Sequence, residues 1–115
     1  MWIITPIGFF SIVRKPDDEA SNTLTVRARV RGDLEALRAL CPELGDIAES
    51  PHNDYRFRAR GPNAAVGAAL ARLTEDIDYD NFKSAVGARQ GHERAHLYHD
   101  VWDVLYRLQR PARGE

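Results

Sequence analysis

The sequence TLTVRARV, residues 23–30, sets the pattern from which the fold can be predicted. Apolar and short polar or basic residues alternate strictly along it. One side of an extended segment would carry Leu24, Val26, Ala28 and Val30. The other side would carry Thr23, Thr25, Arg27 and Arg29. Because successive side chains of a β-strand point to opposite faces, the pattern predicts a strand with one face against a core.

The same alternation returns in YRFRAR, residues 55–60, which Gly61 and Pro62 end. Its expected core side is Tyr55, Phe57 and Ala59, and its outer side is Arg56, Arg58 and Arg60. A third segment, residues 2–13, is apolar almost throughout and is interrupted at Pro6 and Gly8. A strand that is apolar on both faces is typical of the centre of a sheet, so we expect it between the other two.

Three helices are expected around these strands, and the polar residues 15–22 are predicted to form a loop. Asp33 would cap the first helix, whose apolar stripe is Leu34, Leu37, Cys41 and Leu44. Asn63 would cap the second helix, which carries Val66, Leu70, Leu73 and Ile77. The third would run unbroken from about residue 81 to about residue 109 and dock through Tyr98, Val101, Trp102, Leu105 and Leu108.

These elements predict an α+β fold with a three-stranded antiparallel sheet and helices packed on one face. A split crossover would place the strands in the spatial order 2-1-3, which makes the fold a truncated relative of ferredoxin-like sandwiches with a long C-terminal helix. The length predicts a single α+β domain over residues 1–110, followed by a frayed tail over residues 111–115.

The composition is that of a folded chain: 43% of its 115 residues are hydrophobic and 29% are charged. A formal net charge of −1 excludes bulk attraction to nucleic acid or to an anionic membrane, so such a partner would have to meet a local patch. The single cysteine, Cys41, permits no internal disulfide, and the apolar N-terminal run is too short to span a bilayer. We therefore expect a cytoplasmic protein with no membrane partner.

The arginines of the two amphipathic strands form the first candidate site. The predicted outer face carries Arg27, Arg29, Arg56, Arg58 and Arg60, with Phe9 and Ser11 of the apolar strand between them. Arginine forks suit phosphates, and an aromatic ring or a guanidinium plane suits a base. The pattern predicts a non-enzymatic binding module for single-stranded nucleic acid or another polyanion. Two alternatives stay open: charges that keep strand edges from aggregating, and a face covered by a helix or a second copy.

The histidines of GHERAHLYHDVWD, residues 91–103, form the second candidate site. On a helix, His92, His96, His99 and Asp103 fall within one narrow arc. His96 and His99 with Asp103 are candidate catalytic residues for a hydrolase or nuclease. His92 and His96 are weak candidate metal ligands, because further ligands would have to come from elsewhere. Histidines that simply face water are the favoured alternative, and neither a metal nor a cofactor is predicted.

Two stretches carry a resemblance. MWIITPIGFFSIVRKP with LTVRARV, and DIDYDNFK with HLYHDVWDVLY, resemble a group of small uncharacterised bacterial proteins without an assigned activity. The resemblance implies a bacterial, cytoplasmic, stand-alone domain and carries over no site residues. A protein-interaction or homodimeric module is the further alternative, with the sheet face or the Tyr98, Trp102 and Tyr106 side of the C-terminal helix as the contact.

Overall fold

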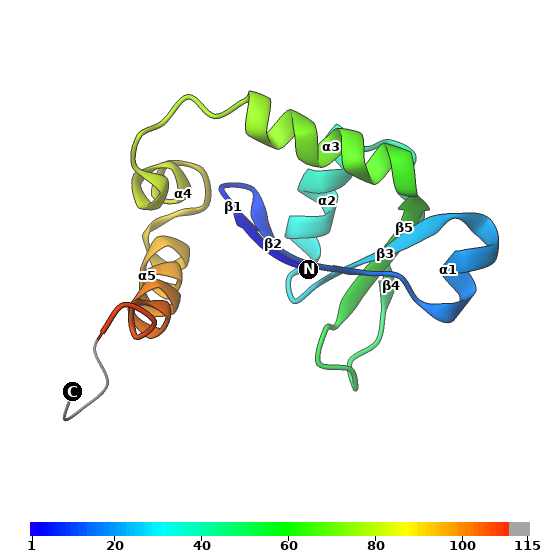
Figure 1. Ribbon diagram of the computed structural model, residues 1–115, viewed down its shortest axis with the longest axis horizontal. Helices are drawn as coiled ribbons and strands as arrows, with labels where there is room; N and C mark the ends of the chain where they lie inside the picture. Colours follow the sequence, from blue (N-terminus) through cyan, green and yellow to red (C-terminus); the bar gives the residue numbers. More distant parts are fainter. Residues whose placement is uncertain (111–115) are drawn as a thin grey trace. The chain divides into compact units, whose positions relative to one another are not determined.

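The computed structural model describes residues 1–110, so the predicted frayed tail lies outside the described residues. Contacts within the chain divide it into two compact units, Met1–Asp78 and Tyr79–Glu115. The first unit contains an antiparallel sheet and three helices, and the described part of the second consists of two helices (Figure 1). The predicted α+β class with an antiparallel sheet is confirmed, and the single-domain organisation of residues 1–110 stays a prediction.

The sheet of the first unit has five strands. They are β1 (Trp2–Thr5), β2 (Gly8–Val13), β3 (Thr23–Ala28), β4 (Ala48–Glu49) and β5 (Phe57–Pro62). Every neighbouring pair is antiparallel, in the order β1-β2-β3-β5-β4. The predicted sheet of three strands in the order 2-1-3 is therefore wrong, because β3 and not the first strand is central. The ferredoxin-like relation stays a prediction.

The apolar run of residues 2–13 forms a hairpin and not one strand. Thr5 closes the turn, since its Oγ1 atom accepts from the amides of Ile7 and Gly8 at 3.2 Å each and donates to the Gly8 carbonyl at 2.9 Å. Pro6 lies in this turn, where no hydrogen bond between strands requires the amide hydrogen that proline lacks. The run thus supplies two paired strands, and β2 pairs with β3 on its other edge.

The three helices of the first unit are α1 (Pro16–Ser21), α2 (Arg31–Leu40) and α3 (Asn63–Glu75). Helices α2 and α3 pack on the face of the sheet that carries Phe10, Val26 and Ala59. The predicted stripe of α2 is confirmed, since Leu34, Leu37, Cys41 and Leu44 are all buried. Burial raises the pKa of the Cys41 thiol, and the charge of Glu43 raises it further, so the thiol is an inert part of the core.

Two predicted caps and one predicted loop need correction. Helix α2 begins at Arg31 after Val30, so Asp33 does not cap it; its buried carboxylate accepts the Phe9 amide hydrogen at 3.0 Å instead. Asn63 is the first residue of α3 and not its cap. Residues 16–21, expected in a loop, form α1, because the buried Asp18 attaches that segment to the outer face of the sheet.

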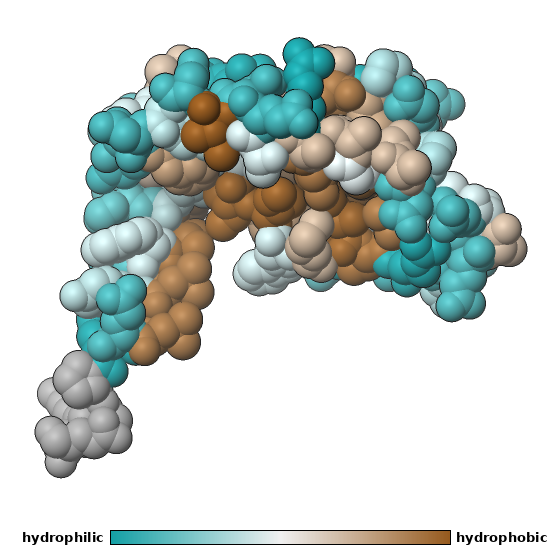
Figure 2. All heavy atoms as spheres, turned by 45° about the horizontal axis from the view of Figure 1, so that its top comes forward, coloured by the Kyte–Doolittle hydropathy of each residue, from teal (hydrophilic) through white to brown (hydrophobic). Residues whose placement is uncertain are grey.

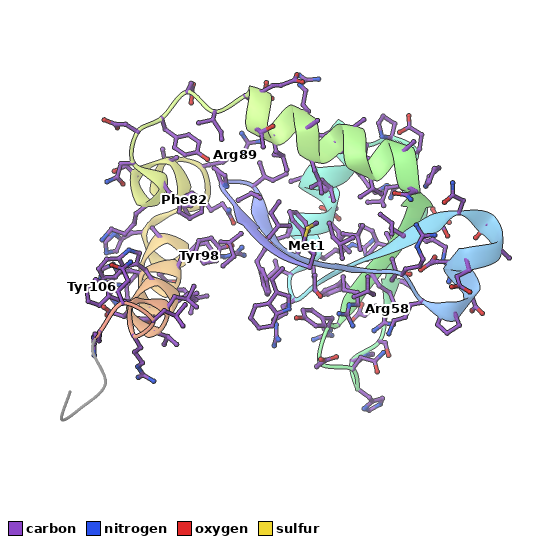
Figure 3. All side chains as sticks on the ribbon, in the orientation of Figure 1. Met1, Arg58, Phe82, Arg89, Tyr98 and Tyr106 are labelled. Carbon is purple, nitrogen blue, oxygen red and sulfur yellow. The ribbon has the colours of Figure 1, made fainter. Side chains whose placement is uncertain are left out.

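The second unit contains α4 (Phe82–Gln90) and α5 (His92–Tyr106). The predicted unbroken helix is wrong, because Gly91 adopts a φ of +98° and ends α4. Val86, Ala95 and Tyr98 are buried where the helices meet, and the rings of Phe82 and Tyr98 stack at 6.2 Å (Figure 3). Trp102, Leu105 and Leu108, which were expected to dock the helix, are exposed.

Candidate functional site

The outer face of the sheet, opposite α2 and α3, carries a row of side chains that runs across four strands. Trp2 pairs with Ser11, Ser11 with Arg27, and Arg27 with Arg58. Paired residues of antiparallel strands point to the same face, so these four form one line, which we call the cross-strand row. Three strand spacings separate Trp2 from Arg58, which is about 14 Å. Figure 3 shows Arg58 on β5.

Aromatic rings accompany the row on the same face. Trp2 meets Phe9 edge to face, with ring centroids 5.5 Å apart, and Phe9 lies 6.4 Å from Tyr55. The guanidinium carbons of Arg27 and Arg29 lie 4.5 and 4.6 Å from the Tyr55 centroid, as cation–π pairs do. Tyr55 is only 3% exposed, whereas Trp2 is 70% exposed. The exposed ring of this face is therefore Trp2, and the tyrosine serves to hold the two arginines.

Two of the five predicted arginines are held in ion pairs. Arg56 precedes β5 and contacts Glu49 of β4 at 2.6 Å. Arg60 contacts the buried carboxylate of Asp18 at 2.8 Å. These acids neutralise two of the five arginines and leave Arg27, Arg29 and Arg58 as the cations available to a ligand.

Arg27 and Arg58 lie directly opposite each other on β3 and β5. Arg27 donates from Nη2 to the Ser11 hydroxyl at 2.7 Å, and no acid of residues 1–110 pairs with either arginine. Their Nε atoms are buried and have no hydrogen-bond partner within that range. Like charges at a directly opposed position destabilise a sheet, and an anion held between them would remove the repulsion.

A hollow of about 530 Å³ adjoins Arg58 on the same face. Its walls come from the start of α1, from β3 and β5 and from the segment that leads into β4. Lys15, Arg58 and Arg60 contribute positive charge to it, and Asp17 and Asp46 contribute negative charge. Because Arg60 is already paired with Asp18, Lys15 and Arg58 are the cations that the hollow offers to an anion.

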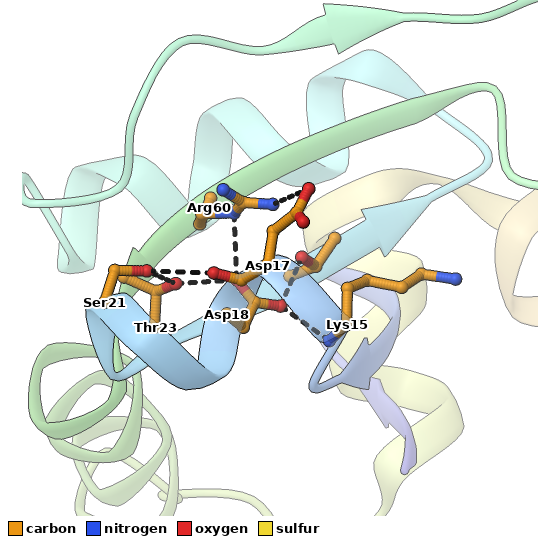
Figure 4. A network of polar contacts seen from close by, with 7 residues as sticks. Lys15, Asp17, Asp18, Ser21, Thr23 and Arg60 are labelled. Atoms are coloured by element: carbon orange, nitrogen blue, oxygen red, sulfur yellow. Dashed lines mark hydrogen bonds and ion pairs between the residues drawn. The ribbon is translucent and has the colours of Figure 1, made fainter.

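The carboxylate of Asp18 fixes one end of this face (Figure 4). It is fully buried and accepts from the Lys15 amide at 2.7 Å, the Thr23 hydroxyl at 2.6 Å and the Thr25 hydroxyl at 2.8 Å. Burial alone would raise the pKa of Asp18, but these hydrogen bonds and the charge of Arg60 outweigh it, so the pKa lies below its ordinary value. Asp18 is therefore a charged structural residue and not a proton donor.

The histidines form a ladder of rings along α5 in the second unit. Neighbouring rings from His92 to His96 and from His96 to His99 stack at 6.4 Å, and His99 stacks on Trp102 at 5.5 Å. His99 also has the Lys83 ammonium 3.4 Å from Nδ1 and the Asp103 carboxylate 3.9 Å from Nε2. The structure thus places His92, His96, His99 and Asp103 on one side of the helix, as the spacing predicted.

The ladder does not assemble into a catalytic centre or a metal centre within the described range. The distance of 3.9 Å from His99 to Asp103 exceeds a hydrogen bond, so the carboxylate does not orient the ring as a base. Among residues 1–110, no group of three or more histidine, cysteine, aspartate or glutamate side chains could hold a metal ion. A hollow of about 360 Å³ beside His99 is lined by the rings of Phe82, Tyr98 and Trp102 and by Asp80, Asn81 and Lys83.

Trp2 is the main site residue that the sequence did not indicate. It belongs to an apolar run without alternation, so nothing in that run says which side of the sheet it faces. Phe9 and Ser11 were expected beside the arginines, and the register places them there. The aromatic contact between Tyr55 and the arginines could not be expected, since Tyr55 was assigned to the core side and lies before β5 begins.

Comparison with models of protein families, with curated proteins and with solved structures finds no match. The resemblance to a group of small bacterial proteins therefore stays a prediction. Within the described residues, none of the helices has the length and apolar character that crossing a membrane requires.

Proposed function

We propose that this chain is a small non-enzymatic binding module that holds single-stranded nucleic acid or another polyanion on the outer face of its sheet. The observation that carries the proposal is the directly opposed pair Arg27 and Arg58, which has no acidic partner among residues 1–110. Each side chain has a buried Nε–H that lacks an acceptor within that range. A phosphate group held at this pair would offset the repulsion between the two charges.

Neighbouring features support the same ligand class. Lys15 in the adjoining hollow extends the positive charge beyond Arg58, and Arg29 extends it at the other end of β3. Since the net charge of the chain is −1, attraction to a polyanion has to come from this patch. The cytoplasm remains the proposed compartment, and a single buried cysteine that forms no internal disulfide is compatible with it.

The double variant Arg27→Ala with Arg58→Ala is expected to bind single-stranded DNA and polyphosphate at least tenfold more weakly than the wild type. Removing two phosphate contacts should also reduce the slope of log affinity against log salt by about 1.4 for a single strand. Fluorescence anisotropy with labelled ligands at two or more salt concentrations measures both quantities.

The matched control is Arg31→Ala with Arg72→Ala, which makes the same change in net charge. Both residues are exposed on helices α2 and α3, and each pairs with an acid four residues further along the chain. This control should bind nearly as the wild type does. The proposal would be contradicted if both double variants lost affinity equally, or if the wild type did not bind at low salt.

A second candidate function is self-association through α5. Figure 2 shows a column of apolar side chains along this helix. Leu97, Val104 and Leu105 of this helix recur at helical spacing and are more than half exposed, as is Leu108 just beyond its end. The occupant that we propose is a second copy of the chain, because a two-fold contact brings the same stripe together from both partners.

Light scattering is expected to give the mass of a dimer for the wild type and that of a monomer for Leu105→Glu, because a buried carboxylate without a partner opposes association. Glu93→Gln is the control, since it changes an exposed charge at the first turn of the same helix. A monomeric wild type at high concentration would contradict self-association.

A further inference from the structure

We infer that the sheet face binds single-stranded nucleic acid in particular, with a base stacked on Trp2 and the phosphates of the same strand on Arg27 and Arg58. The inference deepens the proposed function and rests on it. The proposed function needs only negative charge on the ligand, whereas this inference needs an unpaired base as well.

The first step is the exposure of the ring. Of the three aromatic rings on this face, Tyr55 is covered by two arginines and Phe9 is half-buried, whereas Trp2 is largely exposed. The interplanar angle of 82° with Phe9 means that the two rings meet edge to face. Such a contact leaves at least one face of the indole free of Phe9, and an indole face is a surface on which a base can stack.

The second step is the line that connects this ring to the charges. Trp2, Ser11, Arg27 and Arg58 are successive members of one cross-strand row, so the ring and both guanidinium groups lie on the same face. Two strand spacings, about 10 Å, separate Trp2 from Arg27. A strand laid across the sheet along this row would meet the ring first and the two arginines next, with Ser11 holding Arg27 in place at 2.7 Å.

The third step concerns the form of the nucleic acid. In a duplex the bases stack on one another and their faces are unavailable to a protein ring, so an exposed ring on an open sheet selects unpaired bases. Stacking also tolerates any base, because every base has a π face. We therefore expect a preference for single strands with little dependence on sequence.

Trp2 and Trp102 are the only tryptophans, which gives the experiment a direct readout. In the full-length variant Trp102→Phe, Trp2 is the sole source of indole fluorescence. Titration with a short oligodeoxythymidylate should quench this fluorescence. An abasic oligonucleotide of equal length and charge should bind more weakly and leave the fluorescence nearly unchanged at equal occupancy.

Affinity measurements complete the test. Trp2→Ala should weaken binding of the oligodeoxythymidylate about tenfold and leave binding of the abasic strand unchanged, while Trp2→Phe should retain most of the affinity. The side chain is exposed, so these variants should fold, and circular dichroism checks that they do.

The failures of the two proposals are distinguishable. If the abasic strand binds the wild type as tightly as the oligodeoxythymidylate, or if a duplex binds more tightly than either, the inference is wrong. The proposed function would survive that result provided that Arg27→Ala with Arg58→Ala still weakens binding. If neither strand binds at low salt, both proposals fail.

Discussion

Replacement of Asp18 by alanine is expected to lower the free energy of unfolding of the first unit by about 3 to 4 kcal/mol. The side chain is fully buried and accepts hydrogen bonds from Lys15, Thr23 and Thr25. It also forms an ion pair with Arg60. Removing the acceptor leaves the buried Thr25 hydroxyl without this partner, at about 1 to 3 kcal/mol, and also removes the hydrogen bonds of the part-buried Lys15 amide and Thr23 hydroxyl.

The loss also releases α1 from the sheet. A helix of six residues is too short to be stable on its own, and Asp18 is the buried side chain that attaches it to β3 and β5. Urea denaturation of Asp18→Ala in the Trp102→Phe background measures the effect, because the fluorescence of Trp2 then reports on the first unit alone.

The neighbouring residue supplies the matched control. Asp17 is exposed and lies 3.9 Å from the same arginine. Asp17→Ala should therefore change the free energy of unfolding by no more than about 0.5 kcal/mol. Similar losses in the two variants would mean that the charge near Arg60 matters and the buried network does not.

The same network should make the first unit sensitive to acid. Hydrogen bonds and Arg60 lower the pKa of Asp18 in the folded state, whereas the unfolded chain has the ordinary value of about 3.9. A carboxyl group with a lowered pKa in the folded state stabilises the fold fully at a pH above its pKa in the unfolded chain. This stabilisation is lost as the pH falls through the pKa of the folded state. In the wild type, the free energy of unfolding should therefore decrease as the pH is lowered below about 4. In Asp18→Asn this part of the acid dependence should be absent.

The strands that the sequence predicted well are those in which burial differs between two faces. Val26 and Ala28 are buried on one side of β3 while Arg27 reaches the other, as their alternation indicated. The run of residues 2–13 lacks this difference, and its pattern could not distinguish one central strand from a hairpin. Strand β4 has only two residues, which is too few to show a periodic pattern in the sequence.

Contacts between residues distant in the sequence decided the remaining elements. The segment of residues 16–21 has the composition of a loop, and its helix depends on hydrogen bonds from Asp18 to threonines of β3. Gly91 looks like a tolerated glycine within a helical pattern, and its positive φ could not be read from its neighbours. In the site, alternation predicted where the arginines point, but the pairing of Arg56 with Glu49 and of Arg60 with Asp18 depends on the sheet register.

Two glycine-to-alanine substitutions are expected to change stability in opposite directions. At Gly8, an added Cβ atom would lie 2.5 Å from Cγ of Asp33 and 2.6 Å from its Cβ. Asp33 is buried and its carboxylate accepts the Phe9 amide hydrogen, so it cannot withdraw without lengthening that bond. Overpacking costs about 1 to 3 kcal/mol and a hydrogen bond to a charged group contributes about 1.5 to 3 kcal/mol. We expect Gly8→Ala to destabilise the first unit by about 3 kcal/mol.

At Gly67, inside α3, an added Cβ atom meets nothing within 4 Å. Alanine is the better helix former by about 1 kcal/mol, so Gly67→Ala should raise the free energy of unfolding by up to that amount. The two variants make the same chemical change, and urea denaturation followed through Trp2 compares them directly. The two substitutions are expected to have opposite signs because an added Cβ atom at Gly8 would meet Asp33 of α2, whereas one at Gly67 would meet nothing within 4 Å. A neutral Gly8→Ala would mean that Asp33 moves away from the added Cβ atom at little cost, and it would contradict the predicted destabilisation.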